Sequence, residues 1–185
     1  MLINTIVSII IISAVGTLAH FLYDLTRHNQ IIGLFAAVNE STWEHIKIAL
    51  TPTLLWSLVD GIFYGQNPNY FLAKLVSLIV PVIVIPVIFY GYRSFSKKSV
   101  LAVDILMFYV AICLSQFAMM GILELPEMPF VVRYLACLGT FVFFGAYLLL
   151  TLLPLRMFMF LDPITNRYGF KAHSDKFNPF KKRKK

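Results

Sequence analysis

Charged residues are scarce in this sequence. Asp, Glu, Lys and Arg make up 14% of the 185 residues, whereas hydrophobic residues make up 59%. A soluble domain carries roughly a quarter charged residues and could not hide so much apolar surface from water. This scarcity excludes an ordinary water-soluble fold, and the mean hydropathy of +0.78 indicates that lipid is the main solvent.

Cysteines and common catalytic motifs are also few. The two cysteines, Cys113 and Cys137, lie in separate apolar stretches and cannot form a metal site by themselves. The sequence has no phosphate-binding loop, no CxxC pair and no nucleophile elbow. No apolar run carries the dense row of charges expected of an ion pump or a voltage sensor. The sequence therefore does not support a P-loop nucleotide-binding protein, a CxxC thiol protein, a hydrolase with a nucleophile elbow, an ion pump or a voltage sensor.

What the chain has instead is a series of long apolar runs. A run of about 18 residues or more can cross roughly 30 Å of hydrocarbon as a helix, and these runs lack the alternation typical of barrel strands. The sequence therefore predicts an all-α fold, an integral membrane bundle of about five transmembrane helices. The predicted spans cover residues 2–23, 42–64, 70–92, 99–123 and 129–155. The first has no Lys or Arg before it, so we expect a retained span rather than a secretory signal.

One apolar stretch, residues 31–38, is too short to cross a membrane. We predict that it forms a re-entrant or interfacial segment that turns near Gly33. The expected domains are a transmembrane bundle over residues 1–160 and a basic cytoplasmic tail over residues 161–185. A turn beginning at Asp162 is expected to fold this tail back under the bundle.

Positive charge is unevenly divided between the two sides of this topology. Of the 16 Lys and Arg residues, all but Lys74 and Arg133 fall on the side of the C-terminal tail. Because positive residues stay on the cytoplasmic side, we predict a multi-pass protein of the cell membrane with its N-terminus outside and its C-terminus in the cytoplasm. The terminal run at 181–185 predicts binding to anionic lipid. Membrane lipids are thus the expected partners, and no nucleic acid is expected.

A dense polar group lies where the first span ends and the second begins. Its members are His20, Asp24, Asn39, Glu40, Glu44, His45 and Lys47. His20 and Asp24 are four residues apart and share a helix face, so Asp24 could orient the imidazole or join it as a ligand. Histidines with carboxylates suit zinc or a similar divalent metal that activates water. We therefore predict His20, Asp24 and His45 as metal ligands, and Glu44 and His45 as catalytic residues.

A structural interpretation of the same residues is also open. Ser41 and Glu44 fit the capping-box pattern, in which Ser41 caps the first amides of the second span and Glu44 binds the Ser41 amide. Lys47 could be the ion-pair partner of Glu44, and His45 could face lipid headgroups. The density of ionisable groups favours a site, because it exceeds what a helix cap requires.

Two parts of the chain resemble the signature of a family of small prokaryotic membrane proteins of unknown function. The first part comprises His20-Phe-Leu-Tyr-Asp24, Asn29, Ile32-Gly-Leu-Phe35 and Val38-Asn-Glu-Ser-Thr-Trp-Glu-His45-Ile-Lys47, and the second comprises Phe160-Leu-Asp-Pro163 with Tyr168-Gly169. The resemblance implies a five-span fold and no particular activity. A weaker similarity is to ceramidase-like membrane hydrolases, but the HxxxH pair of those enzymes is missing here.

Three functions are compatible with these patterns. The first is a metal-dependent hydrolase or transferase that acts on a lipid or lipid-linked substrate. The second is transport or binding of a small solute, with the polar group and residues 31–38 forming an inward-facing site. The third is a structural or accessory subunit in which the polar group is only helix-end chemistry.

Overall fold

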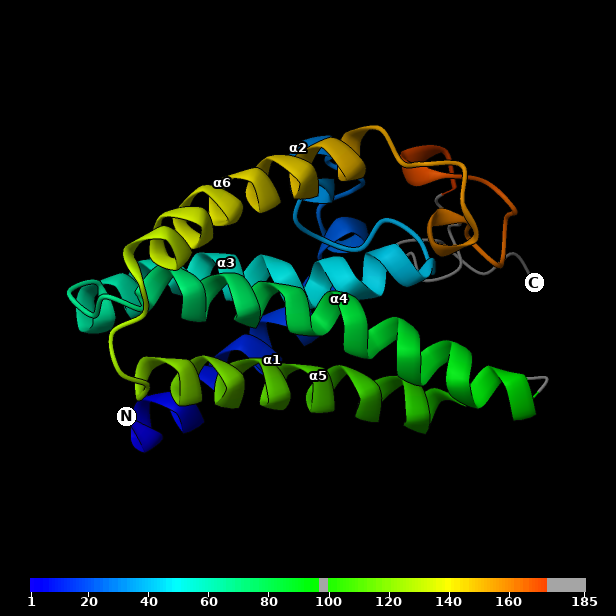
Figure 1. The fold of residues 1–185 in the computed structure, drawn as a ribbon. Coiled ribbons are helices and arrows are strands. Elements are labelled where there is room, and N and C mark those ends of the chain that lie inside the picture. The colour runs from blue at the N-terminus through cyan, green and yellow to red at the C-terminus, as the bar shows by residue number, and fades with distance from the viewer. Residues whose placement is uncertain (97–99, 173–185) are drawn as a thin grey trace, which may run out of the picture.

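The computed structural model describes residues 1–96 and 100–172, and five long helices dominate it (Figure 1). These are α1 (Leu2–Leu25), α3 (Thr42–Tyr64), α4 (Tyr70–Phe95), α5 (Leu101–Leu123) and α6 (Phe130–Leu152). All five are long and apolar enough to cross a membrane. The prediction of an all-α, multi-pass membrane protein is thus confirmed.

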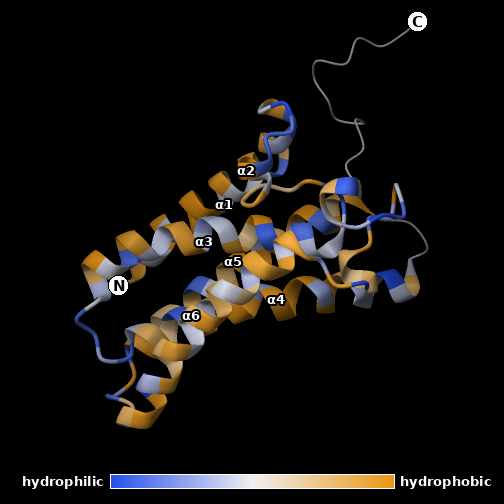
Figure 2. Cartoon of the chain, turned by 90° about the horizontal axis from the view of Figure 1, so that it is seen from above, coloured by the Kyte–Doolittle hydropathy of each residue, from blue (hydrophilic) through white to orange (hydrophobic). Residues whose placement is uncertain are grey.

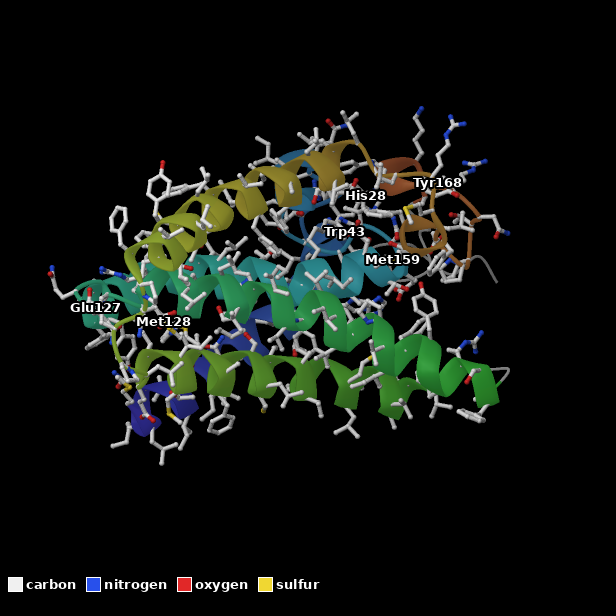
Figure 3. The ribbon with its side chains drawn as sticks, viewed as in Figure 1. His28, Trp43, Glu127, Met128, Met159 and Tyr168 are labelled. Carbon is white, nitrogen blue, oxygen red and sulfur yellow. The ribbon has the colours of Figure 1, made fainter. Side chains whose placement is uncertain are left out.

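The long helices alternate in direction, so the bundle has two distinct ends (Figure 1). One end, here called the loop end, carries α2, the start of α3 and the chain that follows α6. The other, the turn end, carries Met1 and the α3–α4 and α5–α6 connections. Figure 3 shows His28, Trp43 and Tyr168 at the loop end, with Glu127 and Met128 at the turn end.

The core of the bundle lies between α1, α3, α4 and α5. Helix α4 packs against α3, α5 and α6, while α1 packs against α3 and α5. The residues at the centre are apolar and at most 1% exposed: Ile12, Ile46, Leu50, Leu78, Ile85 and Ile112. Hydrophobic residues also cover the outward faces of the long helices (Figure 2), which is expected where those faces meet lipid tails.

A glycine allows α1 and α3 to come unusually close. A Cβ atom added at Gly16 would lie 2.6 Å from the Ile48 carbonyl oxygen and equally close to the Phe108 ring. Small residues at helix crossings let two backbones approach within a membrane. This crossing sets the spacing between His20 on α1 and the first turn of α3.

The short apolar stretch does not cross the bundle. It begins with α2 (Gln30–Gly33), a single turn whose first amides are bound by the Asn29 side chain, with Ile31 N donating to Asn29 Oδ1 at 2.9 Å. Ala36 and Val38 then become buried. The stretch therefore packs back onto the ends of α1 and α3.

The chain after α6 also returns to the loop end. It forms two short 3-10 helices, η1 (Phe158–Phe160) and η2 (Gly169–Ala172). Between them Asp162 starts the predicted turn, in which Asp162 N donates to Arg167 O at 2.9 Å and Asn166 N donates to Asp162 O at 2.9 Å. Residues 158–172 are called the C-terminal clasp below. The predicted basic run at 181–185 lies outside the described residues.

Candidate functional site

An irregular loop, residues 33–41, joins α2 to α3 and packs against α3. Lys47 Nζ and Thr51 Oγ1 each donate to a carbonyl oxygen of this loop at 2.8 Å, and the Tyr147 hydroxyl donates to another at 3.0 Å. Non-helical backbone is tolerated near a membrane only where other groups satisfy its hydrogen bonds. Buried polar side chains from α3 and α6 therefore fix the path of the loop.

Glu44 also binds the backbone of the loop. Its Oε2 lies 2.6 Å from Lys47 Nζ and accepts a hydrogen bond from Val38 N at 3.0 Å, and the side chains of Glu44 and Lys47 are 3% and 0% exposed. The predicted ion pair is thus confirmed. The capping box is not formed, because Glu44 binds the Val38 amide and the Ser41 amide donates to Asn39 Oδ1 instead. The structure therefore places Glu44, a predicted catalytic residue, inside the packed interior.

The C-terminal clasp holds the loop from the other side. Asp162 Oδ1 accepts a hydrogen bond from Glu40 N at 3.1 Å, and Asn39 Nδ2 donates to Gly169 O at 3.1 Å. Asp162 is only 1% exposed, and its second oxygen is bound by the amide and hydroxyl of Thr165. The backbone of Glu40 is consequently fixed between α3 and the clasp.

This support places the Glu40 carboxylate between two imidazole rings from different helices. Glu40 Oε1 lies 3.7 Å from Nε2 of His20 on α1, and Glu40 Oε2 lies 3.8 Å from Nε2 of His45 on α3. The two ring centroids are 5.7 Å apart. The three side chains, which we call the His–Glu–His cluster, are partly open, with exposed fractions of 25% for His20, 27% for Glu40 and 23% for His45.

The two histidines of the cluster differ in their hydrogen bonding. His45 Nδ1 lies 2.9 Å from the Ser41 carbonyl oxygen. Because a carbonyl only accepts, Nδ1 must carry the hydrogen, and the neutral ring presents an unprotonated Nε2 toward Glu40. His20 Nδ1 is buried and has no hydrogen-bond partner among the described residues. Such an atom is uncommon in a purely structural role and calls for a functional explanation.

Asp24, predicted as a ligand beside His20, lies next to another histidine. Its Oδ1 is 3.2 Å from Nε2 of His28. Helix α1 ends at Leu25, and the next turn puts Arg27 and His28 at positive φ angles of 55° and 64°. Asp24 and His28 are also four residues apart, but the left-handed turn, and not a shared helix face, brings the His28 ring to Asp24.

The predicted metal ligands are only partly brought together. His20 and His45 meet, and the carboxylate between them belongs to Glu40. Across residues 1–96 and 100–172, no three His, Cys, Asp or Glu side chains are arranged to hold a metal ion. The donor set therefore does not fit zinc in this conformation. A carboxylate within 4 Å of two imidazoles is instead suited to moving protons.

Glu40 and Asp162 are the residues of the candidate site that were not among the predicted ligands and catalytic residues. Glu40 belongs to the polar group seen in the sequence, and its position before α3 left it free of the helix, which was an available signal. Asp162 was expected only to begin a turn. Its bond to the Glu40 amide joins residues 122 positions apart and has no local signature.

The structure thus defines a polytopic helical membrane protein with a partly exposed acid–base cluster at one end of its bundle. Residues 3–170 match DUF6512, described as a family of unknown function, and the chain belongs to this family. No curated protein and no solved structure matches it. The family resemblance noted in the sequence is confirmed. Membership of this family does not indicate an activity.

Proposed function

We propose that this protein is a membrane-embedded hydrolase or transferase that acts on a lipid or lipid-linked substrate at the His–Glu–His cluster. The observation that carries the proposal is the Glu40 carboxylate, whose oxygens face His20 and His45 at 3.7 and 3.8 Å. These separations exceed hydrogen-bond lengths. The three groups are therefore available to a water or to a substrate hydroxyl.

In this proposal His45 is the general base. The Ser41 carbonyl holds the Nδ1 hydrogen, so Nε2 can take a proton from an attacking water or alcohol. Glu40 stabilises the imidazolium that forms, because a nearby opposite charge favours the protonated ring. His20, protonated before this step and lying at the other carboxylate oxygen, gives its proton to the leaving group, and the proton taken up by His45 then returns to His20 through water.

The predicted zinc enters no step of this mechanism, because the described donors are not arranged to hold it. Glu44 acts as a positioning residue: through Lys47 and the Val38 amide it holds the loop that carries Glu40. In this proposal His45 has the catalytic role predicted from the sequence. The role predicted for Glu44 is assigned to Glu40 instead.

The location of the cluster supports a lipid substrate. His20 lies five residues before the end of α1, which is about 7.5 Å along a helix. Its neighbours Leu18 and Phe21 are 65% and 47% exposed and would meet hydrocarbon in a membrane. A lipid headgroup could therefore reach the imidazoles while its acyl chains stay in the bilayer.

The charge distribution supports an orientation for the cluster. Among the described residues, Lys74 and Arg133 lie toward the turn end, whereas a larger set lies at the loop end: Arg27, Lys47, Arg93, Arg156, Arg167 and Lys171. We propose that the loop end faces the cytoplasm of the cell membrane and that the N-terminus is outside. Binding of anionic lipid by the basic tail remains part of this proposal.

The test of the enzymatic proposal is lipid turnover by the purified protein. Wild type reconstituted in vesicles of extracted membrane lipids should generate new lipid products detectable by mass spectrometry. Glu40→Gln keeps the side-chain shape but removes the charge, and it should lower the rate by about a hundredfold or more, the usual contribution of acid–base catalysis. A chelator should leave the wild-type rate unchanged.

Glu127→Gln is the matched control. Glu127 is a carboxylate at the turn end, 61% exposed and 2.6 Å from Arg133, so its loss should not affect the cluster. Thermal melting establishes that both variants are folded. Equal lipid products from wild type and Glu40→Gln would show that the cluster is not an active site.

A further inference from the structure

The turn end contains a second group of ionisable residues, Asp60 on α3 and Lys74 on α4. Asp60 Oδ2 and Lys74 Nζ are 2.5 Å apart, and the two residues are 5% and 2% exposed. Ionisable side chains inside membrane spans are costly and usually mark a functional position. A buried ion pair is also weak support for stability, because desolvation offsets much of its attraction.

The Lys74 ammonium has fewer acceptors than the other buried lysine, Lys47. Lys47 binds both the Glu44 carboxylate and the Gly33 carbonyl. Within the described part of the chain, Lys74 Nζ has Asp60 as its acceptor. An ammonium carries three hydrogens, so this site retains unused donors in an apolar interior.

A small cavity adjoins Asp60, and its wall contains both polar residues and the apolar residues Met1, Met119, Met120 and Leu123. Its volume is about 10 Å³, which is roughly the space of one water molecule. The residues that supply oxygen-bearing side chains to its wall come from α1, α3 and α5: Asn4, Thr5, Ser8, Asp60, Tyr64 and Gln116. Asn4 is exposed at the turn end, so the cavity lies close to the aqueous surface.

We propose that this cavity and the Asp60 carboxylate form a binding site for a small monovalent cation such as Na⁺. Carboxylate, hydroxyl and amide oxygens are the ligands that hard cations prefer. The bound ion replaces the Lys74 ammonium at Asp60. Lys74 then releases one proton to water and becomes a neutral amine, so the buried net charge does not change.

The cation site is separate from the His–Glu–His cluster. Ser8 and His20 are twelve residues apart on α1, or roughly 18 Å along the helix. The buried side chains of Ile12, Leu50 and Ile112 lie in the core between the two ends. The site therefore goes beyond the proposed enzymatic function and is open to the opposite side of the membrane.

Proton release gives the site a pH dependence with a definite sign. Affinity for Na⁺ should rise about tenfold per pH unit while the free protein holds Lys74 protonated, because each bound ion displaces one proton. The other titratable groups near Asp60 are Tyr64 at the cavity and Tyr70 on α4, whose hydroxyl donates to Ser57 O at 2.9 Å. The proton comes from Lys74, because the bound cation takes its place at Asp60 and repels its ammonium.

The experiment compares NaCl with choline chloride at equal concentration, using the full chain in detergent. Na⁺ should raise the melting temperature and acidify a weakly buffered sample by up to one proton per bound ion. The double variant D60N/K74Q should show neither effect. It removes both buried charges together, and so avoids the stranded charge that a single substitution would leave.

Two further variants make the result specific. Glu127→Gln, which removes an exposed carboxylate at the same end, should respond to Na⁺ like wild type. Glu40→Gln should also respond normally, which separates this inference from the enzymatic proposal. The inference is overturned if wild type melts identically in Na⁺ and choline without releasing protons, or if D60N/K74Q responds like wild type.

Discussion

At the scale of single residues, the protein uses buried charge for two different tasks. Lys47 is fully enclosed, with its ammonium shared between a carboxylate and a loop carbonyl. Its role is to make irregular backbone compatible with a membrane border. Lys74 meets one carboxylate beside a cavity. The number of acceptors around each ammonium therefore separates a structural lysine from a candidate exchange site.

Lys47→Met should destabilise the fold by about 3–5 kcal/mol, because it strands the Glu44 charge in the interior. It also leaves the Gly33 carbonyl without its partner. The free energy of unfolding, measured by denaturation in mixed detergent micelles, checks this. Lys171→Met is the control, since Lys171 is exposed at the same end and its loss should be nearly neutral. Equal stability of the two variants would contradict the structural role of Lys47.

At the scale of elements, the crossing of α1 and α3 decides whether the cluster can assemble. Gly16 and Ile48 are the contact that sets this crossing, and His20 and His45 extend from the same two helices. A change of crossing distance moves one imidazole relative to Glu40. The proposed chemistry therefore depends on a glycine about one helical turn away from His20.

Gly16→Ala should destabilise the bundle by about 1–3 kcal/mol, because the new methyl group collides with the Ile48 carbonyl oxygen as well as with the Phe108 ring. Gly145→Ala on α6 has no atom within 4 Å of the added Cβ. It should be neutral or stabilise by up to about 1 kcal/mol, the difference in helix propensity. Melting temperatures of the two variants provide the comparison. A Gly16→Ala protein as stable as Gly145→Ala would contradict the close crossing.

The long helices could be predicted from the sequence because hydropathy is local. Their ends shift by a few residues: the last span was predicted to reach 155, whereas α6 ends at Leu152, since Pro154 cannot continue a helix. His20 and His45 could be selected by residue type and density. The choice of Glu40 over Asp24 and Glu44 as their partner was not settled by the sequence, because the position of Glu40 depends on Asp162, and the bond between Asn39 and Gly169 spans 130 residues.

At the scale of the whole molecule, the proposed topology of five crossings puts Met1 and the C-terminal clasp on opposite sides of the membrane. Figure 1 shows Met1 at the turn end and η2 at the loop end. In this proposed topology the His–Glu–His cluster and the Asp60–Lys74 pair face different aqueous phases. We therefore expect an acidic outer medium to act on the proposed cation site without changing the protonation of the cluster.

A reporter fused after Lys185 should lie in the cytoplasm. Green fluorescent protein at that position should fluoresce and alkaline phosphatase should be inactive, because the positive residues hold this end inside. Phosphatase fused in the α3–α4 turn, at Asn67, should be active. The reverse pattern would invert the orientation and place the cluster outside the cell.

The C-terminal clasp has a consequence for biosynthesis. Because Asp162 is synthesised 122 residues after Glu40, all five long helices are made before the clasp can bind the loop. A nascent chain stalled earlier would be inserted yet lack its acid–base centre. The protein would thus acquire its proposed activity only after residues 158–172 have been made.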